Sequence, residues 1–340
     1  MFLQFVLLFS TLFATIGAMD MINTGVCARN SEIQNKFFNI AFNDGFMGAD
    51  VASSYSLGNG NYLWLYGDTV WGHFSGKERI FSSMTRNSIG IVRDNTLHLI
   101  GNKTYFTTND LTYEQWIWVA SFDTVNKYVL GWIMEIDHSS ILGFRFARNV
   151  VFDLNINDFS YDEVAITLPF HNRIQWGACV YRQSDTTALV YGVIDQSTNV
   201  AVMLCDNSFS HCQVLNKNLE FSTPNNIDGV KVLFEGMYSE FSIRKDHHTG
   251  TFSILSIEAF GSPFITAIES PDLISWSEPR RVCAVDEEMS RLGMFCYAIK
   301  FHPEISPFSY TVNCNVVSDF EERIKTNPSL YIPQFLEIHL

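Results

Sequence analysis

The stretch that decides the fold runs from Gly48 to Gly72, GADVASSYSLGNGNYLWLYGDTVWG. A Gly-Asn-Gly turn at 58–60 separates two runs rich in β-branched and aromatic residues, and this combination predicts a β-hairpin. Asp50 and Asp68 lie nine residues before and nine residues after Asn59. In an antiparallel ladder without a bulge they therefore stand opposite each other, with Cβ atoms roughly 5 Å apart.

Two carboxylates at this distance repel each other and titrate as a coupled pair, which costs stability. Glycosidic-bond hydrolysis nevertheless requires paired carboxyl groups, one as acid and one as base or nucleophile. The alternative is structural: Asp50 caps its strand, and Gly67-Asp68-Thr69 forms an ordinary turn whose carboxylate accepts from backbone amides. Spacing alone favours the structural interpretation.

Composition limits the class of protein and its partners. The chain has 340 residues, of which 47% are hydrophobic and 17% are charged, and it contains no block of like charge. It can therefore bury a full core, and a disordered tail is not expected. The net charge of −14 repels phosphate backbones and anionic membranes, so we expect no nucleic-acid partner.

Residues 1–18, MFLQFVLLFSTLFATIGA, are apolar and end in small residues, which predicts a signal peptide although a basic n-region is missing. The mature chain, 19–340, is then a soluble monomer without membrane contact. We expect it outside the cell or in the lumen of a secretory or endolysosomal compartment. The N-glycosylation sequon Asn102-Lys103-Thr104 agrees with this route.

The seven cysteines should partly pair in an oxidising compartment. The short spacings predict disulfides between Cys205 and Cys212 and between Cys283 and Cys296. The odd number leaves at least one thiol free unless it bonds another chain. No CxxC spacing or His pair accompanies the cysteines, so no metal site is predicted.

The rest of the chain predicts an all-β protein, because helical periodicity is scarce and short apolar or alternating runs recur. Five such runs recur about every 60 residues, at 62–66, 128–133, 188–193, 252–257 and 308–312. They predict a single five-bladed β-propeller domain. The run 331–338 has no partner of its own and is expected to complete a blade begun near the N-terminus. A β-sandwich or two stacked β domains are the alternatives, but no linker divides the chain.

The order of several motifs resembles a known family. YGDTVWG at 66–72, with Asp50 before it and MTRNS at 84–88 after it, resembles the first blade of secreted propellers catalogued as domains of unknown function. These propellers are related to glycoside hydrolase family 43 furanosidases, and some act as endo-D-arabinanases. Residues 113–150 contain no motif that aligns, and Gln334 stands where relatives often carry Arg. The remaining motifs are similar to later blades: Trp176-Gly177-Ala178, Glu240-Phe241-Ser242-Ile243, SPDLISWS at 270–277, His302-Pro303-Glu304 and Ser309-Tyr310-Thr311.

The resemblance implies a sugar-binding funnel with Asp50 and Asp68 as its catalytic carboxyl groups. If both face the funnel, the charge of one raises the pKa of the other, which can then protonate the leaving oxygen. Asp68 is assigned as acid and Asp50 as base, with the exchange of roles left open. Glu240 is a third candidate acid. If Glu240 is the acid, Asp68 instead tunes the pKa of a neighbour. The structural alternative is that Glu240 is an exposed strand residue.

Six further residues are expected to bind substrate, each with a structural alternative. Arg86 and Asn87 can bond sugar hydroxyls or orient a carboxylate, or form a bridge between blades. The aromatic side chains can stack on sugar or belong to the core. His302 can donate to sugar, ligate a structural ion or be a buried core histidine. The six candidates are Trp71, Arg86, Asn87, Trp176, His302 and Tyr310.

These observations predict a secreted glycoside hydrolase that acts on an arabinan-like polysaccharide without a redox cofactor or metal, although a structural ion in the channel stays open. No phosphate loop, GxSxG or HExxH motif supports other hydrolase or nucleotide chemistry. The alternative is a carbohydrate-binding or adhesive propeller without catalysis. A purely structural propeller is the third possibility.

Overall fold

The computed structural model describes residues 25–340 except 36–44, 77, 94–95, 141–142, 196, 237–239, 260, 286–292, 317–318 and 328–329. The expected signal peptide lies outside these residues. The regular elements of the described chain are nearly all β-strands, as predicted. The helical segments are short and lie at 31–35, Ile227–Gly229 (η3) and Phe320–Thr326 (α2). Within it, no helix is both long and apolar enough to span a membrane.

The predicted hairpin is present. Strands β3 (Ser53–Gly58) and β4 (Asn61–Tyr66) pair antiparallel, with Ser53 opposite Leu65. Asn59 and Gly60 have φ of 53° and 73°, the left-handed conformation that Asn and Gly tolerate best. The local sequence therefore sets both the turn and the register of its strands.

The sheet that contains this hairpin is joined to a second sheet at the open end of the hairpin. The strands β2 and β3 follow each other directly along the chain, as do β4 and β5 and then β6 and β7, so the two sheets are joined by three short junctions. Asp50 lies at the first junction and Asp68 at the second. One sheet has the order β2-β5-β6 and the other β3-β4-β7-β8. Their remaining strands are β2 (Phe46–Ala49), β5 (Thr69–Ser75), β6 (Glu78–Thr85), β7 (Ser88–Arg93) and β8 (Thr96–Leu99).

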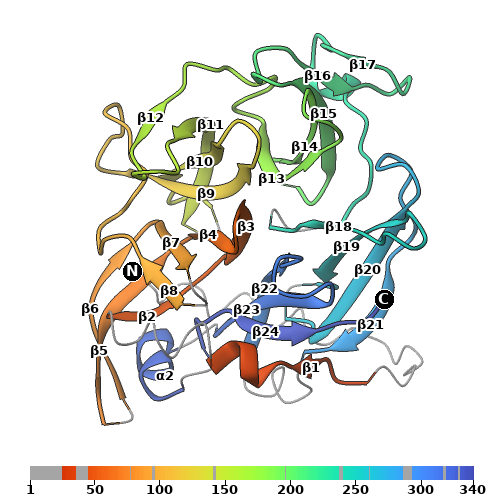
Figure 1. Cartoon of the computed structure of the whole chain (residues 1–340). Coiled ribbons are helices and arrows are strands. Elements are labelled where there is room, and N and C mark those ends of the chain that lie inside the picture. The colour runs from red at the N-terminus through yellow and green to blue at the C-terminus, as the bar shows by residue number, and fades with distance from the viewer. Residues whose placement is uncertain are drawn as a thin grey trace.

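Three further antiparallel sheets follow in chain order around the molecule (Figure 1). The first, β12-β11-β10-β9, is built from β9 (Gln115–Asp123), β10 (Tyr128–Ile136), β11 (Phe144–Leu154) and β12 (Tyr161–Glu163). The second is built from β13 (Ile174–Arg182), β14 (Thr187–Ile194), β15 (Val200–Asp206), β16 (Cys212–Leu215) and β17 (Phe221–Ser222). The third comprises β18 (Ile243–Lys245), β19 (Phe252–Ile257), β20 (Phe264–Ser270) and β21 (Arg280–Ala284).

The last sheet joins the two ends of the described chain. Its order is β1-β24-β23-β22, so the N-terminal strand pairs with the C-terminal strand. This pairing agrees with the prediction that the last run joins an N-terminal segment, although β24 also pairs with β23. The strands are β1 (Ala28–Arg29), β22 (Met294–Phe301), β23 (Ser309–Val316) and β24 (Gln334–Glu337).

Buried asparagine side chains bind the backbone of a neighbouring sheet at three places. The amide nitrogen of Asn87 donates to the carbonyl of Ile117 in β9 at 2.9 Å. Asn149 of β11 donates to the carbonyl of Ile174 in β13 at 2.8 Å. Asn313 of β23 donates to the carbonyl of Ala49 in β2 at 2.8 Å. These bonds satisfy buried backbone groups and fix the neighbouring sheets to each other.

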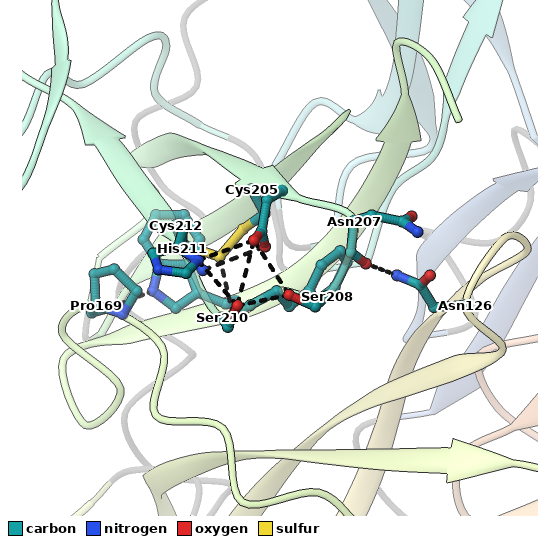
Figure 2. Close-up of a disulfide and its surroundings, with 11 residues drawn as sticks. Asn126, Pro169, Cys205, Asn207, Ser208, Ser210, His211 and Cys212 are labelled. Atoms are coloured by element: carbon teal, nitrogen blue, oxygen red, sulfur yellow. Dashed lines mark hydrogen bonds and ion pairs between the residues drawn. A yellow bond between two sulfur atoms is a disulfide. The ribbon is translucent and has the colours of Figure 1, made fainter. Parts of the chain in front are cut away.

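The disulfides are partly as predicted. Figure 2 shows Cys205–Cys212, which joins paired positions of β15 and β16. The predicted Cys283–Cys296 pair is wrong, because the structure pairs Cys27 with Cys283 and Cys296 with Cys314. The first of these bonds fastens the N-terminal segment to β21, and the second lies across β22 and β23. Cys179 is buried and free.

Candidate active site

Asp50 and Asp68 lie side by side at the junction of the first two sheets. The amide of Asp50 donates to the carbonyl of Asp68 at 3.1 Å, and the amide of Gly67 donates to the carbonyl of Asp50 at 2.8 Å. The two acids stand opposite each other as predicted, but the ladder expected without a bulge is wrong, because a bulge between Ser56 and Gly58 produces this register. A Cβ on Gly67 would lie 2.6 Å from Asp50 Oδ1, so glycine leaves room for this carboxyl group.

Two tyrosines from the C-terminal part of the chain meet Asp50. The hydroxyl groups of Tyr297 in β22 and Tyr331 each donate to Asp50 Oδ2 at 3.2 Å. Burial raises the pKa of Asp50 well above its ordinary value, and the charges of Asp68 and Glu240 raise it further, against the effect of the two tyrosine bonds. Asp50 therefore keeps its proton to a higher pH than an exposed aspartate does.

Asp68 has a different environment, because both of its oxygens have donors. Arg86 Nη1 lies 3.0 Å from Oδ2, and Trp118 Nε1 in β9 donates to Oδ1 at 3.0 Å. Burial raises the pKa of Asp68, while the charge of Arg86 and both hydrogen bonds act to lower it. The donors are arranged to stabilise the ionised form of this carboxyl group.

Glu240 supplies a third carboxyl group. It is partly buried and lies shortly before β18. Burial raises its pKa, and the charge of Lys300 opposes that rise. Its charge in turn acts on Asp50 and on Tyr297, so Glu240 belongs to the same electrostatic cluster. The interpretation of Glu240 as an exposed strand residue is therefore wrong.

The cluster is assembled from separate sheets. The first two sheets contribute the aspartates, the β9 sheet contributes Trp118, and the last sheet contributes Tyr297. Glu240 comes from the segment that leads into β18. Three carboxyl groups in one electrostatic cluster, with different donors and pKa values shifted by burial, can hold and exchange protons with a bound substrate.

Arg86 orients a carboxylate, one of the roles expected for it. Its guanidinium is ion-paired with Asp68 and lies 4.6 Å from the ring centroid of Trp116. Its side chain is 39% exposed, so the ion pair itself adds little to stability. The bond connects two of the junctions between the first two sheets, and does not reach a later sheet.

Asn87 and Trp176 are in the wrong place for the predicted sugar contact. Both are fully buried. Asn87 bonds four backbone groups around residues 105, 106 and 117. The Trp176 indole packs in the core among residues of β13 to β15. Their structural alternatives are correct, because neither side chain has a surface to offer a ligand.

His302 is likewise a core histidine. It has no exposed surface, its Nε2 lies 2.7 Å from Thr311 Oγ1, and its ring stacks on Trp64 with centroids 4.9 Å apart. Trp71 and Tyr310 are 5% and 2% exposed and belong to hydrophobic clusters. The predicted sugar contacts of these three side chains are therefore also wrong.

Sequence reasoning missed four members of the cluster: Trp118, Tyr297, Lys300 and Tyr331. Trp118 alternates with Trp116 in an aromatic strand, and this could have indicated a shared face toward the site. Lys300 interrupts the apolar strand MFCYAIKF, a signal for a buried charge. Nothing local indicates the two tyrosines, because their contacts join residues more than 240 positions apart.

Metal binding at the site is not indicated by its residues. In the described ranges, no three His, Cys, Asp or Glu side chains form a group that could hold a metal ion. The expected independence from metals and redox cofactors stays a prediction.

The comparisons with known proteins place the chain in a family. A candidate hydrolase from Bacteroides ovatus has a similar fold, with a TM-score of 0.72, 14% identity and 88% of each chain covered. An α-L-arabinofuranosidase from Lactobacillus brevis has a TM-score of 0.48 and 13% identity, over 86% of this chain and 90% of that one. No curated protein matches. Residues 34–339 match the domain of unknown function DUF5005, and the chain therefore belongs to this family.

Proposed function

We propose that this chain is a secreted glycoside hydrolase of furanosidase type that cleaves an arabinan-like polysaccharide. The observation that carries the proposal is the convergence of Asp50, Asp68 and Glu240, whose pKa values are all raised by burial. Like charges gathered in this way cost stability, and hydrolysis of a glycosidic bond requires such a pair of carboxyl groups. The motif order of the sequence supports the furanose class of substrate.

A five-bladed propeller accounts for this convergence. In this arrangement, the first two sheets form one blade with long, bent strands, and the other four sheets form one blade each. The asparagine bonds support it, because Asn87 and Asn149 each bind the next blade and Asn313 binds the first blade from the last. The first strand of a propeller blade lies nearest the axis, which brings β9 and β22 to a common centre.

The contacts favour a division of roles different from the one assigned on sequence. Asp68 has donors on both oxygens that favour its ionised form against the effect of burial, and its charge raises the pKa of Asp50. Asp50 then acts as general acid and protonates the leaving oxygen. Glu240 faces the cation Lys300 and acts as base or nucleophile.

The test is hydrolysis of a glycan panel by the purified mature chain. We expect the wild type to release sugars from arabinan-type polysaccharides, and Asp50→Asn to lose this activity while remaining folded. Thr124→Ala, which alters an exposed turn, is the matched control and should keep full activity. Binding of a glycan without hydrolysis by the wild type would contradict the proposal and establish the carbohydrate-binding alternative.

A further inference from the structure

A buried lysine stands beside the third carboxyl group. Lys300 lies near the end of β22 and is 3% exposed, although lysine is seldom buried. Its ammonium donates to the carbonyl of Phe241 at 3.1 Å. A buried ammonium is costly without a counter-charge, so burial lowers the pKa of Lys300, and the charge of Glu240 opposes that fall.

The neighbouring residue of β22 holds the same segment. The amide of Phe301 donates to Ser242 Oγ at 2.6 Å. Consecutive residues of β22 thus bond consecutive residues 241 and 242, which directly follow Glu240. This double contact fixes the backbone that carries the Glu240 carboxyl group.

Among the described residues, Lys300 is the cation whose charge lowers the pKa of Glu240. Lys300 in β22 acts on Glu240 as the opposite charge, while Asp50 and Tyr297 face it as acidic groups. Cys179 in β13 also faces Lys300, but burial raises the pKa of this thiol to about 11, so it stays neutral near pH 7. Glu240 is therefore the acidic group whose charge favours the protonated form of Lys300.

We propose that Lys300 is a positioning residue that fixes the Glu240 segment and supplies the counter-charge that keeps Glu240 ionised for its role as base or nucleophile. This inference rests on the proposed function for its catalytic consequence. The contacts between β22 and residues 241 and 242 carry its positioning part, and the effect of the Lys300 charge on the pKa of Glu240 carries its electrostatic part. It also explains how three neighbouring acids differ: Asp68 is paired with Arg86, Glu240 is influenced by Lys300, and Asp50 accepts hydrogen bonds from two tyrosine hydroxyl groups.

Two variants separate the charge from the hydrogen bond. Lys300→Gln removes the charge and keeps an N–H donor, whereas Lys300→Met removes both. Lys245→Met is the matched control, because Lys245 is exposed in β18 and packs near Phe252. Lys300→Arg keeps the charge and should restore the wild-type behaviour.

The first readout needs no activity. The titration of Glu240 is followed by ¹³C NMR of glutamate-labelled protein, with the signal assigned by its loss in Glu240→Gln. We expect the Glu240 titration to move to higher pH in both Lys300→Gln and Lys300→Met, and to stay unchanged in Lys245→Met. An unchanged Glu240 titration in either folded Lys300 variant would overturn the inference, whether or not the protein is an enzyme.

The second readout is the pH dependence of kcat/KM. Because a base must be ionised, loss of Lys300 should move the acidic limb to higher pH and lower kcat/KM on that limb by about tenfold. A shift confined to the basic limb would contradict the role of Glu240 as base. If the wild type hydrolyses nothing while the NMR titration moves as expected, the proposed function fails and the Lys300–Glu240 pairing stands.

Discussion

Two polar clusters of this protein bury carboxyl groups in opposite ways. In the cluster of Asp50, Asp68 and Glu240, burial raises the pKa of all three carboxyl groups, and the charges of Asp68 and Glu240 raise the pKa of Asp50 further. In the second cluster, Ser54 bonds both His302 and Glu304, and His302 also bonds Thr311. We call these the carboxyl cluster and the histidine cluster.

The difference indicates what each cluster is for. The histidine cluster combines donors with acceptors, and its members are 0–8% exposed, as expected for polar groups that stabilise a core. It borders a cavity of about 450 Å³ lined by Ser54, Tyr62, Thr124 and Glu304 among others. The carboxyl cluster opposes folding by its repulsion, which is typical of a site kept for chemistry.

The largest expected effect separates the two clusters by activity. Asp50→Asn and Glu240→Gln should each lower kcat/KM by about 10³-fold, because each removes a proton-transferring group. Ser54→Ala should leave kcat/KM per folded molecule within about twofold of the wild type. The measurement is steady-state hydrolysis of arabinan, with circular dichroism to establish folding. Equal losses in both clusters would remove the distinction between them.

The next effect separates them by stability. His302→Ala should lower the free energy of unfolding by about 3 kcal/mol, because it leaves a cavity beside Trp64 and removes one hydrogen bond each from Ser54 and Thr311. Chemical denaturation measures this loss. A variant as stable as the wild type would show that the histidine cluster is not structural.

A smaller effect concerns the orientation of Asp68. Arg86→Met should lower kcat/KM by about tenfold, because Asp68 loses its cation and its charge no longer holds the proton on Asp50. The free energy of unfolding should change by less than about 1 kcal/mol, because the ion pair is partly exposed. A large loss of stability in denaturant titrations would instead identify Arg86 as a structural residue.

The smallest effect is the pH dependence of stability. A carboxyl group whose pKa is raised on folding binds more protons in the folded state, so its contribution falls as pH rises from its ordinary value, near 4, through the raised value. Asp50→Asn removes this penalty and should raise the melting temperature by about 2 °C at pH 7.5. The gain should shrink at pH 4.5. A lower melting temperature than wild type at pH 7.5 would mean that ionised Asp50 stabilises the fold.

The sequence predicts the features that depend on neighbouring residues. The turn at Asn59 forms the predicted hairpin, and with the bulge between Ser56 and Gly58 its register brings Asp50 opposite Asp68. The Cys205–Cys212 disulfide follows from short spacing for the same reason. These features need no knowledge of how distant segments pack.

Features that depend on distant packing could not be predicted. Cys283 bonds Cys27, 256 residues away, and not the nearby Cys296. Trp176 and His302 belong to motifs of the kind found around funnels, but packing places both side chains inside the core. Tyr297 and Tyr331 reach Asp50 only because the last sheet lies against the first. A sequence pattern reports residue types, and burial decides which of them can meet a ligand.

The most direct test of the central claim, that the carboxyl groups work as one site, is a double-mutant cycle of Asp50→Asn and Glu240→Gln on kcat/KM. Residues that act as a unit give grossly non-additive losses. We predict that kcat/KM of the double variant is no more than about tenfold lower than that of the less active single variant. Losses that multiply, about 10⁶-fold in total, would contradict the claim and show that the two carboxyl groups act independently.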